Sequence, residues 1–451
     1  MSIKNIGIKP PEVLLPEITI NLNKWSVVAC DQYSSQPEYW SEVERIVAGE
    51  PSTLRLIFPE VYLEEGRAEE RITNINDTMR RYIADKLLVE KGTGFIYIDR
   101  KTAHTESRKG LLIAIDLEQY DYNPGAKTLI RATEGTVLDR LPPRIKVREN
   151  APIEVPHVML LIDDPEMTVI EPLSVQTERM ERLYDFELMM NGGHIKGYRV
   201  SDSAMEESIM KAFVSLAKPE SFRAKYGVGP EKDILLFAAG DGNHSLATAK
   251  AVWENIKASL TASEFENHPA RYAMVEVVNV HDQGLTFEPI HRVVFNVNGK
   301  NLLDRIVGYC NRNNSKAYFQ EFNNKAELEQ ERKKLTVSGD CHVIPYISGT
   351  SRGLLVVQHP KFNLEVATLQ KALNDISDNE GNLKIDYIHG EDVLSSLASQ
   401  DGNIGFYLEP MDKHDLFKTV ILDGVLPRKT FSMGEAEEKR FYLECRKITT
   451  T

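Results

Sequence analysis

The sequence has little of what marks several protein classes. Its four cysteines, Cys30, Cys310, Cys341 and Cys445, are widely spaced and form no CxxC pair, which argues against a disulfide framework and a zinc site. No apolar run approaches the roughly 20 residues that a helix needs to cross a bilayer. The N-terminus also lacks the basic start and continuous apolar core of a signal peptide. We therefore expect a cytoplasmic protein with reduced thiols and no membrane partner.

Positive charge is also in short supply. The 451 residues include 54 Lys and Arg against 67 Asp and Glu, a formal net charge of -13, and no basic run compensates for it. Such a surface repels nucleic acids and anionic lipids, so we expect no nucleic-acid partner. Hydrophobic residues make up 42% and charged residues 27% of the chain, as in an average globular protein. A chain of this length favours two or three domains.

Several catalytic signatures are missing as well. The chain has no GxxxxGK[ST] loop, no GxGxxG after a strand, no HExxH and no GxSxG, so the common nucleotide-binding and hydrolase folds are unsupported. Apolar strand patterns and amphipathic helix patterns alternate instead, without internal repeats. The pattern predicts an α/β or α+β fold with mixed sheets and flanking helices.

Nearly all the dense polar clusters lie in the first part of the chain. We expect a motif-bearing portion over residues 1–295 and a C-terminal α/β portion over residues 296–451, divided at NVNGKN. GFIYIDR and KGLLIAIDL alternate as an antiparallel hairpin, and residues 64–91 have the pattern of one long amphipathic helix. DILLFAAGDGNHSLATAKAVWENIKA is the clearest strand, turn and helix in the chain.

The turn in that segment, DGNH, is the first candidate site. Glycines let a ligand approach the backbone, and the N–H groups and dipole of the following helix attract phosphate or carboxylate. Asp241 is a candidate base or Mg²⁺ ligand, and His244 is a candidate donor to a phosphoryl oxygen. An ordinary Asp-Gly turn with helix capping is the alternative. The candidate residues of the turn are Gly240, Asp241, Gly242, Asn243, His244 and Ser245.

Two further segments carry candidate residues. IRATEGTVLDRLPPRIKVREN contains the carboxylate Glu134, and Arg140 and Arg144, which can grip an anion through paired N–H groups. A solvated charged loop is the alternative, and two consecutive prolines argue against a single helix there. TFEPIHR places His291 and Arg292 on a strand edge, where a surface ion-pair cluster explains them at least as well.

Taken in order, these motifs resemble a bacterial family catalogued as domain of unknown function 1015. VVACDQYSSQPEYW resembles its vvappYD segment, TEGTVLDR its HERT and EDR segment, and GDGNHSLATA its ADGHHRYETA signature. FEPIHRVV and LPRKTF resemble its lptHRl and mPpKST elements, so the resemblance runs through most of the chain. This sequence departs from the family at Asn243, Ser245 and Thr133, where the family has His, Arg and His.

The Asp-Gly-x-His turn is also similar to that of the ParB and sulfiredoxin superfamily, some members of which phosphorylate free serine. This resemblance implies a phosphotransferase that acts on a small hydroxyl metabolite, such as serine, with ATP or ADP and Mg²⁺. By analogy, Asp241 and His244 lie at the phosphate site and Glu134 activates the hydroxyl. The further cofactor-binding candidates are Arg140, Arg144, His291, Arg292 and Lys429 of LPRKTF.

Two other functions are open at this point. A non-catalytic regulatory protein would bind a nucleotide or phosphorylated metabolite without turnover, and a phosphohydrolase would run the phosphate chemistry in reverse. Loss of the Glu134 carboxylate distinguishes the regulatory protein from an enzyme, because a protein that only binds its ligand would keep its ligand affinity without this group.

Overall fold

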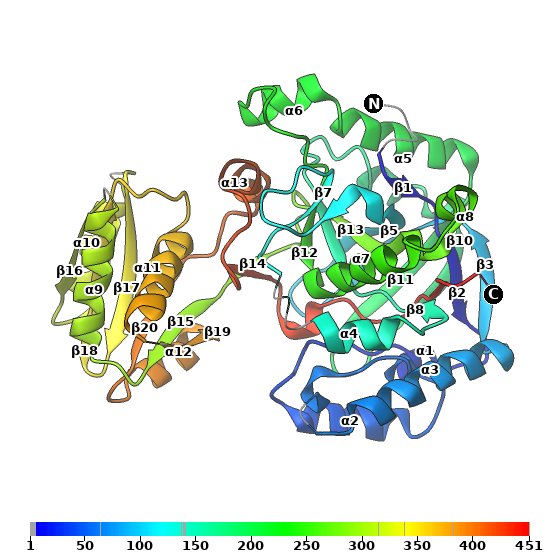
Figure 1. Cartoon of the computed structure of the whole chain (residues 1–451), viewed down its shortest axis with the longest axis horizontal. Coiled ribbons are helices and arrows are strands. Elements are labelled where there is room, and N and C mark those ends of the chain that lie inside the picture. Colours follow the sequence, from blue (N-terminus) through cyan, green and yellow to red (C-terminus); the bar gives the residue numbers. More distant parts are fainter. Residues whose placement is uncertain are drawn as a thin grey trace. The chain divides into compact units, whose positions relative to one another are not determined.

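A computed structural model describes residues 6–63, 65–136, 138, 141–313, 315–337, 339–381 and 383–450. The chain forms two compact units (Figure 1). Unit 1 comprises Met1–Thr286 and Met433–Thr451, and unit 2 comprises Phe287–Ser432. Each unit combines helices with a sheet, which confirms the expected fold class of mixed sheets with flanking helices. None of the described helices is long and apolar enough to cross a membrane.

Unit 1 is built on a ten-stranded sheet. Its strands are β1 (Ile8–Lys9), β4 (Phe95–Lys101), β5 (Arg108–Asp116), β6 (Tyr120–Asp121), β7 (Ile130–Ala132), β9 (Met159–Ile162), β10 (Glu181–Glu187), β11 (His194–Val200), β12 (Phe237–Asp241) and β13 (Tyr272–Asn279). The order is β10-β11-β4-β5-β13-β9-β12-β7-β6, with β1 paired to β5. β13 pairs in parallel with β9, and β12 with β7, while the other central pairs are antiparallel. The predicted β4–β5 hairpin is confirmed.

Helices and smaller sheets complete unit 1. Its helices are α1 (Leu22–Trp25), α2 (Pro37–Val47), α3 (Ala68–Ala84), α4 (Leu141–Arg148), α5 (Ser203–Leu216), α6 (Pro219–Tyr226), α7 (Asn243–Lys257) and α8 (Ala262–Asn267). The two small sheets pair β2 (Glu12–Pro16) with β3 (Leu88–Thr93), and β8 (Ile153–Glu154) with β22 (Arg446–Lys447). The single helix expected over residues 64–91 is wrong, because its last part is strand β3.

Both faces of the large sheet are buried. Along β4, Ile96 and Ile98 pack into one hydrophobic core with α2, α3 and the end of the chain. Phe95 and Tyr97, which alternate with them, pack into a second core with α5 and α7. Figure 1 shows the blue helices α2 and α3 and the green helices α5 and α7 around this sheet. The site described below lies beside α7.

Unit 2 has a six-stranded antiparallel sheet in the order β16-β18-β17-β20-β15-β19. Its strands are β15 (His291–Phe295), β16 (Lys316–Glu321), β17 (Cys341–Ser348), β18 (Ser351–Gln358), β19 (Lys384–Ile388) and β20 (Ile404–Phe406), and β14 (Phe287–Pro289) and β21 (Phe431–Met433) lie where the chain enters and leaves the unit. Its helices are α9 (Gly299–Arg312), α10 (Lys325–Val337), α11 (Glu365–Glu380), α12 (Glu391–Ala398) and α13 (Leu416–Asp423). α9 and α11 pack on one face of the sheet, and α10 and α12 on the other.

The division into units differs from the boundary expected after Phe295. β15 belongs to unit 2 because it pairs with β19 and β20, which come much later in the chain. The end of the chain, expected in the C-terminal portion, belongs to unit 1, where β22 pairs with β8. The boundary cannot be found from local patterns, because both corrections depend on pairings between distant segments.

Unit 2 contains a buried histidine whose titration links its stability to pH. His342 is 7% exposed, its Nδ1 lies 3.0 Å from Thr368 Oγ1, and burial lowers its pKa from 6.5 to about 4. As the pH falls, His342 is protonated in the unfolded chain before it is protonated in the folded protein. This contribution to the free energy of unfolding is therefore fully present above pH 6.5 and is lost between pH 6.5 and pH 4.

We therefore expect unit 2 to lose about 1 kcal/mol of unfolding free energy between pH 7.5 and pH 5.5, as a shift of this size predicts. Urea unfolding of wild type and His342→Gln at both pH values measures it. The variant should lose the contribution of His342 and keep only that of groups such as His291, whose pKa burial also lowers, whereas His414→Gln, at an exposed histidine, should retain the full pH dependence. An equal change in the free energy of unfolding between the two pH values in wild type and His342→Gln would show that other groups control the pH dependence.

Candidate functional site

The strand, turn and helix predicted around DGNH are confirmed. Gly242 makes the turn between β12 and α7, with φ 76° in the left-handed region, and a Cβ there would lie 3.0 Å from Cα of Val158. Gly240 serves packing instead, because a Cβ there would collide with Met433 and Leu161. Turn geometry therefore requires only the second of the two glycines.

Gly242→Ala should lower the free energy of unfolding by about 1–2 kcal/mol through its left-handed φ alone, and further through crowding against Val158. The matched control is Gly227→Ala, because Gly227 has φ 65° and a Cβ there would meet nothing within 4 Å. Urea unfolding of both variants separates backbone strain from crowding. If Gly242→Ala were no more destabilising than the control, the tight approach to Val158 would be unimportant.

Glu134 and Asp241 lie at the ends of two neighbouring parallel strands, Glu134 just after β7 and Asp241 as the last residue of β12. Ala132 of β7 lies opposite Ala239 of β12, and each carboxylate comes two residues further along its own strand direction. Thr133 Oγ1 donates a hydrogen bond of 2.6 Å to Ala239 O and ties the two strand ends together. Both residues therefore lie at the same edge of the sheet, at the carboxyl ends of β7 and β12. Ligands in α/β proteins bind outside the carboxyl ends of parallel strands.

A buried lysine from the end of the chain reaches the same turn. Nζ of Lys439 lies 3.5 Å from Oδ2 of Asp241, and the lysine side chain is 8% exposed. Oδ1 of Asp241 accepts a hydrogen bond of 3.0 Å from the N–H of Gly242. The turn thus brings together a carboxylate, a cation and a helix start. Lys439 was not among the residues that the sequence predicted.

The first turn of α7 presents polar groups toward this edge. The N-cap residue of α7 is Gly242, which has no side chain to cap the helix, and the positive dipole end of the helix lies at this turn. Asn243 Nδ2 donates to Ala239 O at 3.3 Å, whereas its buried Oδ1 finds no hydrogen-bond partner in the described part of the chain. His244 is half-buried, and its carbonyl accepts from Thr248 Oγ1 at 2.7 Å.

The other predicted residues lie in different surroundings. Arg140 falls outside the described residues. His291 and Arg292 lie on β15 in unit 2 and are 2% and 0% exposed, so the surface ion-pair interpretation is wrong for both. Nδ1 of His291 accepts from the N–H of Leu408 at 3.1 Å, and burial lowers the pKa of His291. Lys429, also in unit 2, is exposed and has φ 55°.

Arg292 is held by several partners inside unit 2. Its guanidinium donates to Gln370 Oε1 at 2.9 Å, to Ile290 O at 2.6 Å and to Arg428 O at 2.9 Å, and it lies 4.6 Å from the ring centroid of Tyr387. Acceptors on every side allow an arginine to be fully buried. These contacts tie β15 to the rest of unit 2.

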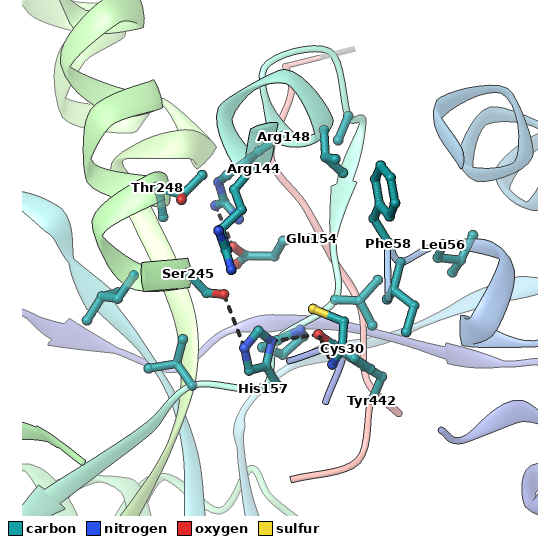
Figure 2. Close-up of a pocket in the computed structure, with 18 of the residues that line it drawn as sticks. Cys30, Leu56, Phe58, Arg144, Arg148, Glu154, His157, Ser245, Thr248 and Tyr442 are labelled. Atoms are coloured by element: carbon teal, nitrogen blue, oxygen red, sulfur yellow. Dashed lines mark hydrogen bonds and ion pairs between the residues drawn. The ribbon is translucent and has the colours of Figure 1, made fainter. Parts of the chain in front are cut away.

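A cavity of about 150 Å³, which we call the α7 cavity, lies beside the first turns of α7. Arg144, the remaining predicted arginine, lines it from α4 and forms an ion pair with Glu60. The consecutive prolines do not prevent this helix, because they stand in its first turn, where no backbone donor is needed. Figure 2 shows the arginines of α4, Glu154 and Ser245 on one side of the cavity and Leu56 and Phe58 on the other.

A chain of hydrogen bonds crosses the floor of the α7 cavity. Ser245 Oγ lies 3.1 Å from Nε2 of His157, and Nδ1 of His157 lies 2.8 Å from the hydroxyl of Tyr442. The N–H of Cys30 donates to that hydroxyl at 3.2 Å. Burial raises the pKa of the Cys30 thiol to about 12 and that of Tyr442 well above its ordinary value. Both groups are therefore neutral at pH 7, and Cys30 is not a nucleophile.

Two arginines share one carboxylate at the side of the cavity. Glu154, 6% exposed, accepts from Arg148 Nη2 at 2.6 Å and from Arg446 Nε at 2.7 Å, and also from the N–H of Met274 at 2.9 Å. Burial by itself would raise the pKa of Glu154, but the two arginines outweigh it and the pKa lies below its usual value. Glu154 is therefore ionised at neutral pH.

A protein-only metal centre is not present in the described residues, where no three His, Cys, Asp or Glu side chains are grouped to hold an ion. Mg²⁺ commonly binds through one or two carboxylates together with phosphate oxygens and water. Asp241 fits that role, because its carboxylate stands at the start of α7.

Comparisons with known proteins give one family. Residues 14–374 match the model of a family described as "Protein of unknown function (DUF1015)", and no curated protein matches the chain. Among solved structures, a free serine kinase variant in complex with AMP is 12% identical, with 75% of this chain and 91% of that chain covered and a TM-score of 0.38. A conserved hypothetical protein from Pyrococcus furiosus is 12% identical, with 74% and 90% covered and a TM-score of 0.34. TM-scores this low establish neither an activity nor a ligand for this chain.

Proposed function

The chain belongs to the DUF1015 family, whose function is unknown, and we propose that it is a phosphotransferase that phosphorylates a small hydroxyl metabolite with a nucleotide and Mg²⁺. One observation carries the proposal: Asp241, at the end of β12, lies beside the buried Lys439 and directly before the start of α7, and Glu134 comes just after the neighbouring parallel strand β7. Phosphoryl transfer needs mainly positioning and charge neutralisation, and these groups are suited to both.

Lys439 and the first N–H groups of α7 are the phosphate-binding groups in this proposal. The helix start attracts anions through its N–H groups and dipole. The family signature has an arginine where this chain has Ser245, and Lys439 adds a positive charge in its place. Asn243 Oδ1, buried and without a partner among the described residues, is placed to accept a hydrogen bond from a bound ligand. Arg144 of the α7 cavity is a further candidate clamp.

The two carboxylates take different roles. When bound, the nucleotide supplies the phosphoryl group and Mg²⁺ neutralises its charge. Asp241 is the carboxylate that would hold the metal, since it lies at the turn itself, next to Lys439. Glu134 takes the proton of the substrate hydroxyl as the general base. The likeness of the DGNH turn to that of ParB-like proteins makes serine the first acceptor to test.

A turnover assay tests the proposal. The protein is incubated with ATP, Mg²⁺ and single hydroxyl compounds, beginning with serine, and products are followed by ³¹P NMR. We expect a phosphorylated product in equal amount to ADP, and its loss in Asp241→Asn but not in Asp77→Asn, at an exposed carboxylate on α3. Nucleotide binding without turnover of any acceptor would instead indicate a binding protein, and nucleotide-independent hydrolysis of phosphoserine a phosphohydrolase.

A further inference from the structure

On one side of the α7 cavity, Arg148 shares its carboxylate partner with a second arginine that lies behind the lining. Arg148 and Arg446 both bind the single carboxylate of Glu154, so this group of three carries one excess positive charge, whereas Arg144 is paired with Glu60. Arg446 is occupied, because its Nη1 and Nη2 donate to the carbonyls of Pro269 and Tyr272. Arg148, which lines the cavity, uses Nη2 for Glu154, and its Nε and Nη1 make no hydrogen bond within the described residues.

The hydrogen-bond chain on the floor turns Ser245 into a donor. The hydroxyl of Tyr442 accepts from the N–H of Cys30, and the imidazole nitrogen of His157 is the best acceptor for its own proton. With Nδ1 as the acceptor from Tyr442, Nε2 of His157 carries the ring proton and donates to Ser245 Oγ. The hydroxyl proton of Ser245 is thereby directed away from His157, toward an acceptor atom in the cavity.

The opposite side of the α7 cavity is apolar. Leu56 and Phe58 line this side and are buried (Figure 2), and the buried side chains of Met79 and Met274 also line the cavity. A cavity of about 150 Å³ is large enough to hold an apolar group about the size of benzene. A ligand that fills this space therefore has an apolar body and places its polar end against Arg148 and Ser245.

We propose that the α7 cavity binds a small monocarboxylate with an apolar side chain, whose carboxylate contacts Arg148 and accepts a hydrogen bond from Ser245. A single negative charge matches the single excess positive charge of Arg148, Glu154 and Arg446. Cavity binding does not depend on the proposed function.

Ligand-observed NMR titration of the full chain, without nucleotide, tests the binding site. The probes are benzoate and 4-methylpentanoate, their uncharged amides, and acetate as a carboxylate without an apolar body. We expect both acids to bind at least about tenfold more tightly than their amides, since a hydrogen bond to a charged group contributes that much or more, and acetate to bind more weakly than either.

Three variants localise the binding. Arg148→Gln should weaken benzoate about tenfold or more, while Arg45→Gln, at an exposed arginine on α2, should not change it. Ala249→Leu places three extra carbon atoms in the cavity from α7 and should abolish binding while every charged residue is retained. Thermal unfolding of each variant identifies any that does not fold.

Equal affinity for acids and amides, binding retained in Ala249→Leu, or no binding of either acid at millimolar concentration would each overturn the proposal. Because no nucleotide is present, these outcomes leave the proposed phosphotransferase activity untouched. Conversely, absence of turnover with every acceptor would leave the acid-binding site standing.

Discussion

Glu134→Gln is expected to reduce the rate of phosphoryl transfer about 10²–10⁴-fold, the contribution of a well-placed general base. Glutamine keeps the shape of the side chain and its position after β7, but it cannot take the proton of the substrate hydroxyl. Nucleotide affinity should stay within about twofold of wild type, because the phosphate-binding groups in our proposal belong to α7 and Lys439. Single-turnover kinetics and calorimetric titration measure the two quantities separately.

The control for this variant is Glu149→Gln, which removes an exposed carboxylate just after α4. It should leave both the rate and the affinity unchanged. Full activity in Glu134→Gln would remove Glu134 from the mechanism. A large loss of nucleotide affinity with an unchanged rate would instead identify Glu134 as part of the nucleotide site.

Arg440→Met is expected to destabilise unit 1 by about 3–5 kcal/mol, the cost of breaking a buried ion pair from one side. Arg440 is 2% exposed and pairs with Glu276 and with Glu444, whose Oε2 lies 2.6 Å from Nη2. Burial by itself would lower the pKa of Arg440, but the two carboxylates outweigh it and raise the pKa. Without the guanidinium, the buried carboxylates of Glu276 and Glu444 each lose their ion-pair partner. Urea unfolding measures the loss.

A triple variant separates lost charge balance from lost packing. Replacing Glu276 and Glu444 together with Arg440 by apolar residues of similar volume should recover most of the stability, as buried ion-pair groups often tolerate such replacement. A loss below about 1 kcal/mol in the single variant would contradict the buried-charge account. Because the same segment carries Lys439 and Tyr442, weakening it should also loosen the turn and the floor of the α7 cavity.

Local patterns predicted the central part of the site but not its surroundings. DGNH was found from sequence because a strand, a glycine turn and a helix follow each other without interruption. Lys439, His157 and Tyr442 were missed because they reach the site through long-range folding. His157 stands directly before a buried strand, and no spacing motif distinguishes it. Residues 433–450 belong to unit 1, where β22 pairs with β8, and no local sequence pattern predicts this pairing.

Burial was the property that the sequence described least well. The sequence offers a ligand site or a surface ion-pair cluster for His291 and Arg292, and both interpretations take these side chains to be accessible, because charged residues are seldom fully buried. In the structure, backbone carbonyls and the amide of Gln370 satisfy Arg292, and such partners come from segments that no local pattern connects. Similarly, the helix expected over residues 64–91 included β3, which is a strand because it pairs with β2 near the N-terminus.

The measurement that tests the central claim most directly is thermal unfolding of the full chain with ADP and Mg²⁺, in wild type and in Asp241→Ala and His244→Ala. A phosphate site at the DGNH turn predicts that saturating ligand stabilises wild type by about 3 kcal/mol at a hundred times Kd, and that both variants lose the shift. A shift that persists unchanged in both variants would place nucleotide binding elsewhere. The absence of any shift in wild type would contradict the account.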